Sequence, residues 1–265
     1  RPMQDHFNGF RPGDPDLFPA AENHFRGQDD LPAKVDVLIV GCGPAGLTLA
    51  AQLSRFPEIC TRIIDQKPGP IEKGQADGIS VRSMEMFQAF GFADNVKREA
   101  YWVNETTFWK PDPADPDKIH RSGRVQDVED GLSEMPHTLM NQARVHQMYL
   151  DIMRNAPTRL EPNYGRKVTS VSIDRAAGDH PVTVELERDD GQTQTVRARY
   201  VVGCDGARSK VRQQIGGTLH GDSANQAWGV MDVLANTDFP DIRMKSIVQS
   251  ASEGNILVLP REGGY

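Results

Sequence analysis

Residues 35–46 read Val35-Asp36-Val37-Leu38-Ile39-Val40-Gly41-Cys42-Gly43-Pro44-Ala45-Gly46. The β-branched run 35–40 is typical of a buried strand in a parallel sheet. A glycine turn follows it, and the residues from Pro44 to Arg55 predict a helix. A second apolar run, from Arg62 to Asp65, predicts the next strand. Together these elements make a βαβ unit.

The glycines of this unit have the spacing G-x-G-x-x-G, which is typical of a phosphate-binding turn. The first glycine makes the tight turn, the second lets a pyrophosphate approach the backbone, and the third lets the helix pack on the strand. The helix N-terminus offers free N–H groups to the phosphate. An acid at the end of the next strand can accept hydrogen bonds from ribose hydroxyls. The predicted dinucleotide contacts are Gly41, Gly43, Pro44, Ala45, Gly46 and Asp65.

Composition bounds the function classes that fit the chain. Its 265 residues carry a formal net charge of −7, which argues against a nucleic-acid partner and against binding to an anionic membrane surface. The 3 cysteines are far apart, so neither a disulfide framework nor a Cys-x-x-Cys metal site is expected. No signal peptide and no membrane span are predicted, and the reducing cytoplasm is the expected compartment.

The remaining chain alternates between predicted helices and strands. Residues 1–33 lack any period and predict an irregular arm, a candidate interface for a homodimer. Asp190-Gly191 between two alternating runs predicts a β-hairpin. Further helices are expected at 81–90, ending at Gly91, and at 143–154. Further strands are expected at 101–109, 200–202, 227–233, 245–249 and 255–259, and a polar turn region at 111–117.

A second set of motifs lies beyond the glycine turn. The strand 200–202 ends in Gly203-Cys204-Asp205-Gly206 and leads into a helix start. With this motif the chain resembles the class A flavoprotein aromatic hydroxylases. Three further segments resemble the phenol hydroxylase subgroup of that family, in matching order and spacing. These segments are Gly74-Gln75-Ala76-Asp77-Gly78 with Arg82-Ser83-Met84-Glu85, then Leu139-Met140-Asn141-Gln142-Ala143-Arg144, and Leu259-Pro260-Arg261-Glu262.

The resemblance implies an α/β fold, in which a Rossmann-like FAD-binding domain of the glutathione-reductase type is interleaved with a β-rich substrate domain. The FAD-binding domain is expected at 34–110 and 138–220, including the hairpin 181–200. The substrate domain is expected at 111–137 and 221–265. The family's second flavin signature, Gly-Asp-Ala-Ala-His, is absent. We therefore expect the C-terminal part of the family fold to be missing from this chain.

The resemblance also implies FAD as cofactor and NADPH, or NADH, as co-substrate. In such enzymes a flavin hydroperoxide transfers oxygen to a phenolic ring, ortho to its hydroxyl. Many family members carry an arginine where this chain has Gln75, which suits the phenol hydroxylase branch. Trp228 is expected either to wall the pocket or to be a core residue. The cofactor contacts that the resemblance implies beyond the glycine turn are Asp65, Gln66, Lys67, Gly74, Gln75, Ala76, Arg82, Gln142, Asp205, Trp228 and Arg261.

Three residues are the candidates for substrate chemistry. Asp77 is the candidate base or acceptor for the phenol hydroxyl, the alternative being a turn-forming Asp before Gly78. The resemblance implies that Lys245 and His137 bind a ring carboxylate, whose charge needs a partner in a dry pocket. Taken alone, a strand lysine and a loop histidine are usually surface residues.

Several functions stay open. The resemblance favours oxidation of 3-hydroxybenzoate to 3,4-dihydroxybenzoate with O2, and the alternative substrate is phenol, giving catechol. Another FAD oxidoreductase on the same scaffold is a further alternative, although the Trp-x-Trp-x-Ile stretch of halogenases is absent. A non-catalytic dinucleotide-binding module is the alternative from a different class.

Overall fold

A computed structural model describes residues 2–6, 9–12, 16–24, 31–74, 76–222 and 224–262. The chain divides into two compact units. The first comprises Arg1–Glu72 with His146–Asp222, and the second comprises Lys73–Val145 with Ser223–Tyr265. The bounds of these two units differ from the expected domain boundaries. Residues 73–110 and 138–145 were expected in the FAD-binding domain but fall in the second unit. The assignment of an FAD-binding and a substrate domain stays a prediction.

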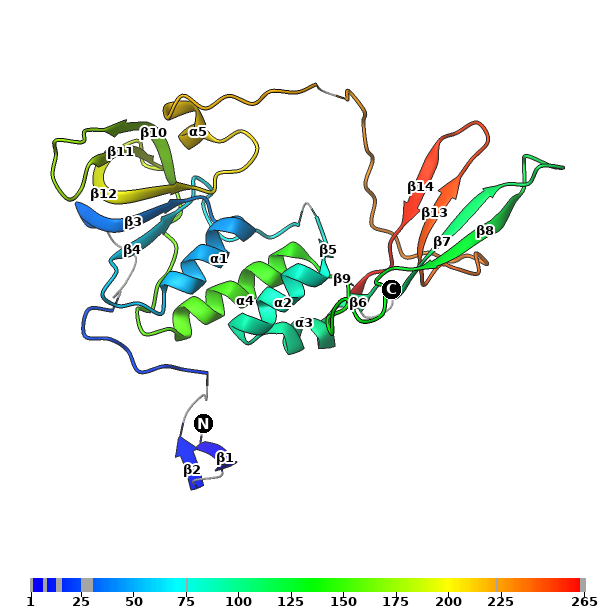
Figure 1. The fold of residues 1–265 in the computed structure, drawn as a ribbon, viewed down its shortest axis with the longest axis horizontal. Helices are drawn as coiled ribbons and strands as arrows, with labels where there is room; N and C mark the ends of the chain where they lie inside the picture. Colours follow the sequence, from blue (N-terminus) through cyan, green and yellow to red (C-terminus); the bar gives the residue numbers. More distant parts are fainter. Residues whose placement is uncertain are drawn as a thin grey trace. The chain divides into compact units, whose positions relative to one another are not determined.

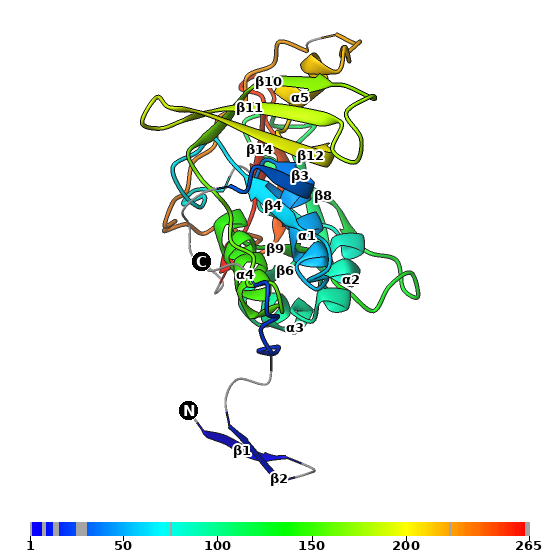
Figure 2. The ribbon, with the colours of Figure 1, turned by 90° about the vertical axis from the view of Figure 1, so that its left-hand side faces the viewer.

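The first unit is built on a five-stranded sheet of order β10-β11-β12-β3-β4. Strand β3 pairs in parallel with both β12 and β4, so the predicted βαβ unit is confirmed. Figure 1 and Figure 2 show α1 on the β3 and β4 part of this sheet, and α5 packs against β10 and β12. The elements are β3 (Lys34–Val40), α1 (Pro44–Leu53), β4 (Thr61–Ile64), β10 (Arg166–Ile173), β11 (Val182–Arg188), β12 (Thr193–Gly203) and α5 (Lys210–Gln214).

The core of this unit follows from strand alternation. Val184 on β11 lies opposite Val196 on β12, and both are fully buried. The turn between these strands contains Gly191 with a φ of 77°, a conformation that glycine adopts freely. The predicted hairpin is therefore confirmed. The buried cluster consists of Leu31, Val35, Leu38, Val40, Ile64, Val168, Val171, Val184, Leu186, Val196, Ala198 and Val211.

The N-terminal arm is more regular than predicted. It begins with two antiparallel strands, β1 (Pro2–His6) and β2 (Gly9–Pro12), so the prediction of an irregular segment over 1–33 is wrong for these residues. Residues 16–24 contain no strand and lie against the first unit. The backbone N–H of Phe18 donates to the carbonyl of Asn155 at 2.9 Å, and Arg159 donates back to the carbonyl of Phe18 at 2.6 Å.

The second unit combines a four-stranded sheet of order β14-β13-β7-β8 with a three-stranded sheet of order β5-β9-β6. The helix predicted over 81–90 has these bounds, and Gly91 ends it with a φ of 90°. Helix α4 begins in this unit and continues into the first. The elements are β5 (Gly78–Ile79), α2 (Val81–Phe90), α3 (Ala93–Glu99), β6 (Tyr101–Trp102), β7 (Glu105–Pro111), β8 (Ile119–Gln126), β9 (Thr138–Leu139), α4 (Gln142–Asn155), β13 (Lys245–Gln249) and β14 (Asn255–Val258).

Two strand predictions in this unit are wrong. The expected strand 101–109 is interrupted at 103–104, where the backbone N–H of Val103 donates to the carbonyl of His137, and its halves β6 and β7 join different sheets. The expected strand 227–233 does not form, since the described residues 224–239 carry neither helix nor strand. Their β-forming side chains are exposed, Val230 by 93%, and have no partner strand to pack on.

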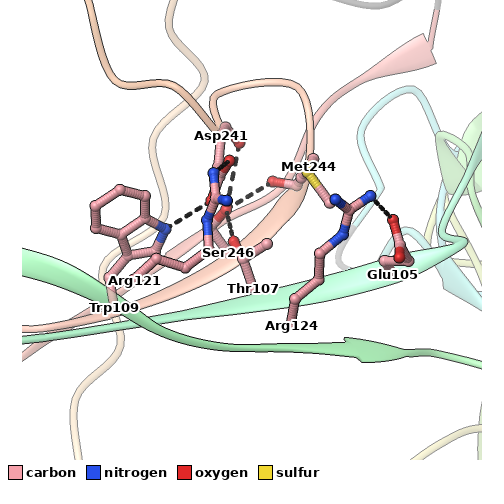
Figure 3. Close-up of polar contacts among 8 residues, drawn as sticks. All are labelled: Glu105, Thr107, Trp109, Arg121, Arg124, Asp241, Met244 and Ser246. Atoms are coloured by element: carbon pink, nitrogen blue, oxygen red, sulfur yellow. Dashed lines mark hydrogen bonds and ion pairs between the residues drawn. The ribbon is translucent and has the colours of Figure 1, made fainter.

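A buried carboxylate anchors the chain just before β13. Figure 3 shows Trp109 and Arg121 converging on Asp241, which is 3% exposed. The indole N–H of Trp109 and Nε of Arg121 each donate to Oδ2 of Asp241 at 2.8 Å. Behind them, the buried hydroxyls of Thr107 and Ser246 lie 2.8 Å apart across β7 and β13. These contacts fix the start of β13.

The helices of the described residues are between 5 and 14 residues long. None combines the length and the apolar character that a membrane-spanning helix needs.

Candidate functional site

The glycine turn of the first unit is closed by contacts that exclude side chains. Gly41 has a φ of 108°, and a Cβ there would lie 2.3 Å from the carbonyl oxygen of Cys204. A Cβ on Gly46 would lie 1.9 Å from the carbonyl oxygen of Gly41. A Cβ on Gly43 would meet no described atom within 4 Å. Gly41 and Gly46 therefore shape the turn, whereas Gly43 leaves its backbone accessible.

Helix α1 begins at this accessible turn. Gly43 is its N-cap and Pro44 its first residue, and no side chain caps the helix. The first N–H groups of a helix have no intrahelical acceptor, and the helix dipole adds positive potential there. The geometry is suited to an anionic ligand such as a pyrophosphate.

Asp65 connects the glycine turn to the end of β4. Its Oδ2 accepts a hydrogen bond of 2.7 Å from the backbone N–H of Cys42, and its Oδ1 accepts one of 2.9 Å from that of Lys67. The next residues, Gln66 and Lys67, are exposed. A carboxylate has further lone pairs, so Asp65 can still accept from a ribose hydroxyl.

Asp205 lies beside the same turn, since a Cβ on Gly41 would be 2.9 Å from its backbone nitrogen. Its carboxylate accepts from the backbone N–H groups of Lys210 at 2.6 Å and Val211 at 3.1 Å, and from the hydroxyl of Ser209 at 2.5 Å. Burial opposes ionisation, but these hydrogen bonds outweigh it and lower the pKa of Asp205. The side chain thus orders the start of α5, and its backbone borders the glycine turn.

A pocket of about 380 Å³ opens in the first unit, next to the segment that follows Asp65. His146 is buried nearby, with Nε2 3.2 Å from the hydroxyl of Tyr164, and no described group bonds its Nδ1. Burial lowers the pKa of His146, which is therefore neutral. Sequence reasoning missed this pair, because neither residue belongs to a motif. The pocket is lined by Pro68, Gly69, Pro70, Leu150, Arg154, Glu161, Pro162, Asn163, Tyr164 and Arg166.

The second unit brings Asp77 and Arg261 together. The Arg261 guanidinium donates to Oδ2 of Asp77, while Oδ1 of Asp77 is buried and has no described hydrogen-bond partner. A Cβ on Gly74 would lie 3.0 Å from that Oδ1 and 3.0 Å from Cβ of Gln142. Three predicted site residues, Arg261, Gly74 and Gln142, therefore lie around the carboxylate of Asp77, whose Oδ1 has no described hydrogen-bond partner.

His137 and Lys245 also meet in the second unit, through a residue that the sequence analysis missed. His137 Nδ1 lies 2.6 Å from Oδ2 of Asp127, and Lys245 Nζ lies 3.3 Å from its Oδ1. Burial would raise the pKa of Asp127, but the hydrogen bonds and charges of these two neighbours lower it. Asp127 follows β8 directly and is part of no recognisable motif.

Strand pairing connects these two clusters. Strand β5 pairs antiparallel with β9, with Gly78 opposite Leu139 and Ile79 opposite Thr138, so Asp77 and His137 flank this short ladder at its opposite ends. A Cβ on Gly78 would lie 3.7 Å from Nε2 of His137. The structure therefore places His137 against the segment that carries Asp77.

Other predicted site residues do not belong to the clusters described above. Trp228 is 79% exposed in the irregular segment, so the prediction of a core position for it is wrong, and the alternative that it walls the cofactor pocket stays a prediction. The side chain of Arg82 is 90% exposed and pairs with Glu85 at 2.7 Å. Ala76 is exposed. Gln75 lies outside the described residues.

Comparison with known proteins identifies the family. The model of the FAD binding domain matches residues 34–264. The chain belongs to the class A FAD-dependent aromatic hydroxylase family. It is 64% identical over 267 residues to a 3-hydroxybenzoate 4-monooxygenase of Comamonas testosteroni, covering 99% of this chain and 42% of that protein. The expected family and α/β fold class are confirmed.

Other relatives of this family are more distant. A phenol 2-monooxygenase of Aspergillus fumigatus is 34% identical, over 86% of this chain and 37% of its own length. The solved structure of the flavin-dependent monooxygenase PieE, in complex with FAD and substrate, is 27% identical with a TM-score of 0.61, over 72% of this chain and 33% of that one. The chain thus spans about two fifths of the length of the curated relatives it matches.

Proposed function

We propose that the chain is part of an FAD-dependent monooxygenase that hydroxylates 3-hydroxybenzoate to 3,4-dihydroxybenzoate, with NADPH or NADH and O2 as co-substrates. The observation that carries the proposal is the meeting of His137 and Lys245 beside the segment of Asp77. One cluster offers an ammonium and an imidazole for a carboxylate, and the other offers an acceptor for a hydroxyl. The 64% identity to a 3-hydroxybenzoate 4-monooxygenase supports the same substrate.

The first unit has features that suit FAD. The open backbone at Gly43 and the uncapped start of α1 would hold the pyrophosphate, and Asp65 would accept from the ribose. Gln142 and Arg261 stay predicted flavin contacts, on the family resemblance alone. When bound, FAD supplies the redox chemistry that activates O2.

Asp77 is proposed to accept the proton or hydrogen bond of the substrate's phenol. Its Oδ1 is buried and has no described partner, and it is therefore available to a ligand. Arg261 holds the other oxygen, which fixes the direction of the carboxylate. A phenol that gives up its proton is more electron-rich and is attacked more readily at the ortho carbon.

The substrate carboxylate is proposed to bind Lys245 and His137. An ammonium group can donate to three acceptors, and Lys245 uses one donor toward Asp127. His137 faces Asp127 through Nδ1, which leaves Nε2 for a ligand. A carboxylate in a dry pocket costs several kcal/mol unless such partners are present.

Phenol is the second candidate substrate, because Asp127 already neutralises the charge of Lys245. If phenol is the substrate, the contacts of Asp127 with His137 and Lys245 only stabilise this end of the four-stranded sheet. Cytoplasmic location, a homodimer and the absence of nucleic-acid and membrane partners stay predictions.

The test measures NADPH oxidation by the full-length flavin-loaded protein with 3-hydroxybenzoate, phenol and 4-hydroxybenzoate, and identifies each product. The proposal expects 3-hydroxybenzoate to stimulate oxidation most, with 3,4-dihydroxybenzoate formed. Lys245→Met should lower kcat/KM for 3-hydroxybenzoate by about 100-fold, because the substrate carboxylate loses its charge partner. The same variant should hardly change kcat/KM for phenol. Preference for phenol supports the second candidate. Absence of bound flavin and of stimulation would leave a non-catalytic binding module.

A further inference from the structure

Asp127 lies where three segments of the second unit converge. It directly follows β8, and its backbone N–H donates to the carbonyl of Asn104 at 2.9 Å. Its side chain is 13% exposed. One carboxylate oxygen faces His137, and the other faces Lys245 and, at 3.4 Å, the hydroxyl of Thr106. Both oxygens are therefore occupied by groups from other segments.

The register of the sheet explains this convergence. Lys245 is the first residue of β13 and pairs with Thr106 of β7. Thr106 in turn pairs with Val125 near the end of β8. The three neighbouring strands thus bring Lys245, Thr106 and Asp127 to one end of the sheet, and His137 joins them from the residue before β9.

We propose that Asp127 is a positioning residue that holds His137 and Lys245 together as one recognition unit for the substrate's carboxylate. The inference rests on the proposed function. In a partly buried site the ammonium of Lys245 needs a counter-charge, and the imidazole of His137 needs a partner that fixes the orientation of its ring. The carboxylate of Asp127 supplies both and also fixes the flexible lysine side chain.

The contacts of Asp127 determine which atoms remain for the ligand. Because Asp127 engages Nδ1 of His137, the ring directs Nε2 toward Gly78 and the segment of Asp77. Lys245 keeps two of its three N–H donors. Asp127 thereby makes the enzyme prefer a carboxylated ring without touching the substrate itself.

The experiment compares substrates that differ only in the charge. For the full-length flavin-loaded protein, kcat/KM is measured with 3-hydroxybenzoate and with the uncharged 3-hydroxybenzyl alcohol. Asp127→Asn should lower kcat/KM for 3-hydroxybenzoate about 30-fold, mainly through KM, and that for the alcohol less than about threefold. The matched control is Asp130→Asn, an exposed acid of the same segment, which should behave as the wild type.

Asp127→Glu provides the second variant, in case Asp127→Asn does not fold. It keeps the charge but displaces both partners, so a smaller selective loss of about fivefold for 3-hydroxybenzoate is expected. An equal loss for both substrates, or an unchanged preference in the variants, would overturn the positioning role and leave the proposed function standing. A wild type that 3-hydroxybenzoate does not stimulate would overturn both.

Discussion

The backbone N–H of Cys42 donates a hydrogen bond of 2.7 Å to Oδ2 of Asp65. This contact ties the phosphate-binding turn after β3 to the predicted ribose acceptor after β4. Both ends of the predicted dinucleotide site therefore depend on one carboxylate, which orders the turn and is the predicted acceptor for the ribose.

Replacement of Asp65 by Asn should weaken FAD binding. The amide cannot accept from Cys42, Lys67 and a ribose at once, because one of its two polar groups is a donor. We expect the Kd for FAD to rise about 10- to 100-fold, the cost of one or two hydrogen bonds to a charged group. The measurement is a fluorescence titration of the apoprotein with FAD.

Asp36→Asn is the control for this prediction. Asp36 accepts from the backbone N–H of Cys60 at 2.8 Å, in the same unit but at the opposite end of the strands. This variant should bind FAD as the wild type does. Equal affinity of Asp65→Asn and wild type would show that the carboxylate only orders the turn.

Glycine substitutions in the turn should separate stability from binding. Gly43→Ala places its Cβ in open space and should fold normally, but the added methyl lies where a pyrophosphate would approach. We expect a loss of FAD affinity of at least about 10-fold with a change in unfolding free energy below about 1 kcal/mol.

Gly41→Ala is the matched contrast, since its Cβ would lie 2.3 Å from the carbonyl oxygen of Cys204. It should destabilise the apoprotein by about 3 kcal/mol or more, because both the positive φ and the contact are unfavourable. Urea unfolding of both apoproteins measures the difference. Normal FAD binding by Gly43→Ala would contradict the proposed phosphate site.

Asp77→Asn should impair hydroxylation more than cofactor binding. Loss of a general base typically lowers the rate by about 10²- to 10⁴-fold. We expect product formation to fall by about 100-fold at least while the flavin remains bound. Product quantification against NADPH consumed provides the measurement. Asp94→Asn, an exposed acid of α3, serves as control, and a wild-type rate in Asp77→Asn would exclude the proposed role.

The contribution of Asp241 to the free energy of unfolding should depend on pH. Burial opposes its ionisation, but hydrogen bonds from Arg121 and Trp109 prevail and lower its pKa. The ionised carboxylate therefore stabilises the fold above the unfolded-state pKa of about 3.9, and this stabilisation is lost as pH falls through the lower folded-state value. Asp241→Asn should cost about 1–3 kcal/mol at pH 7, because Arg121 remains partly solvated.

The difference between wild type and Asp241→Asn should shrink below about pH 4, because the carboxylate of the unfolded state takes up a proton there, and it should disappear only below the lower pKa of the folded state. Urea unfolding at pH 7, 5 and 3.5 tests this expectation. Asp238→Asn is the control, because Asp238 is exposed and lies in the same segment. A difference that stays constant with pH would mean that the charge contributes nothing.

The local elements could be predicted because their signals are local. The helix 81–90 ends at Gly91, and the hairpin turns at Asp190-Gly191, since backbone conformation there is set by glycine itself. The break of the strand after Trp102 was not predictable in this way. It depends on a hydrogen bond from Val103 to a residue far along the chain.

The same distinction between local signals and long-range contacts applies to the residues of the candidate site. Asp77 and Gly74 are carried by a motif and lie together as expected. Asp127 has no motif, because only the pairing of β7, β8 and β13 brings it to Lys245. The prediction of a strand at 227–233 was wrong because β propensity without a partner strand does not form a sheet.

The packing of Gly41 against Cys204 has a consequence for the order of assembly. During synthesis the glycine turn leaves the ribosome long before β12, yet the carbonyl of Cys204, the residue after β12, forms one wall of its final shape. The first βαβ unit alone therefore lacks this wall. The turn is complete only when the chain has closed this long loop, so its completion depends on a contact between residues distant in the sequence.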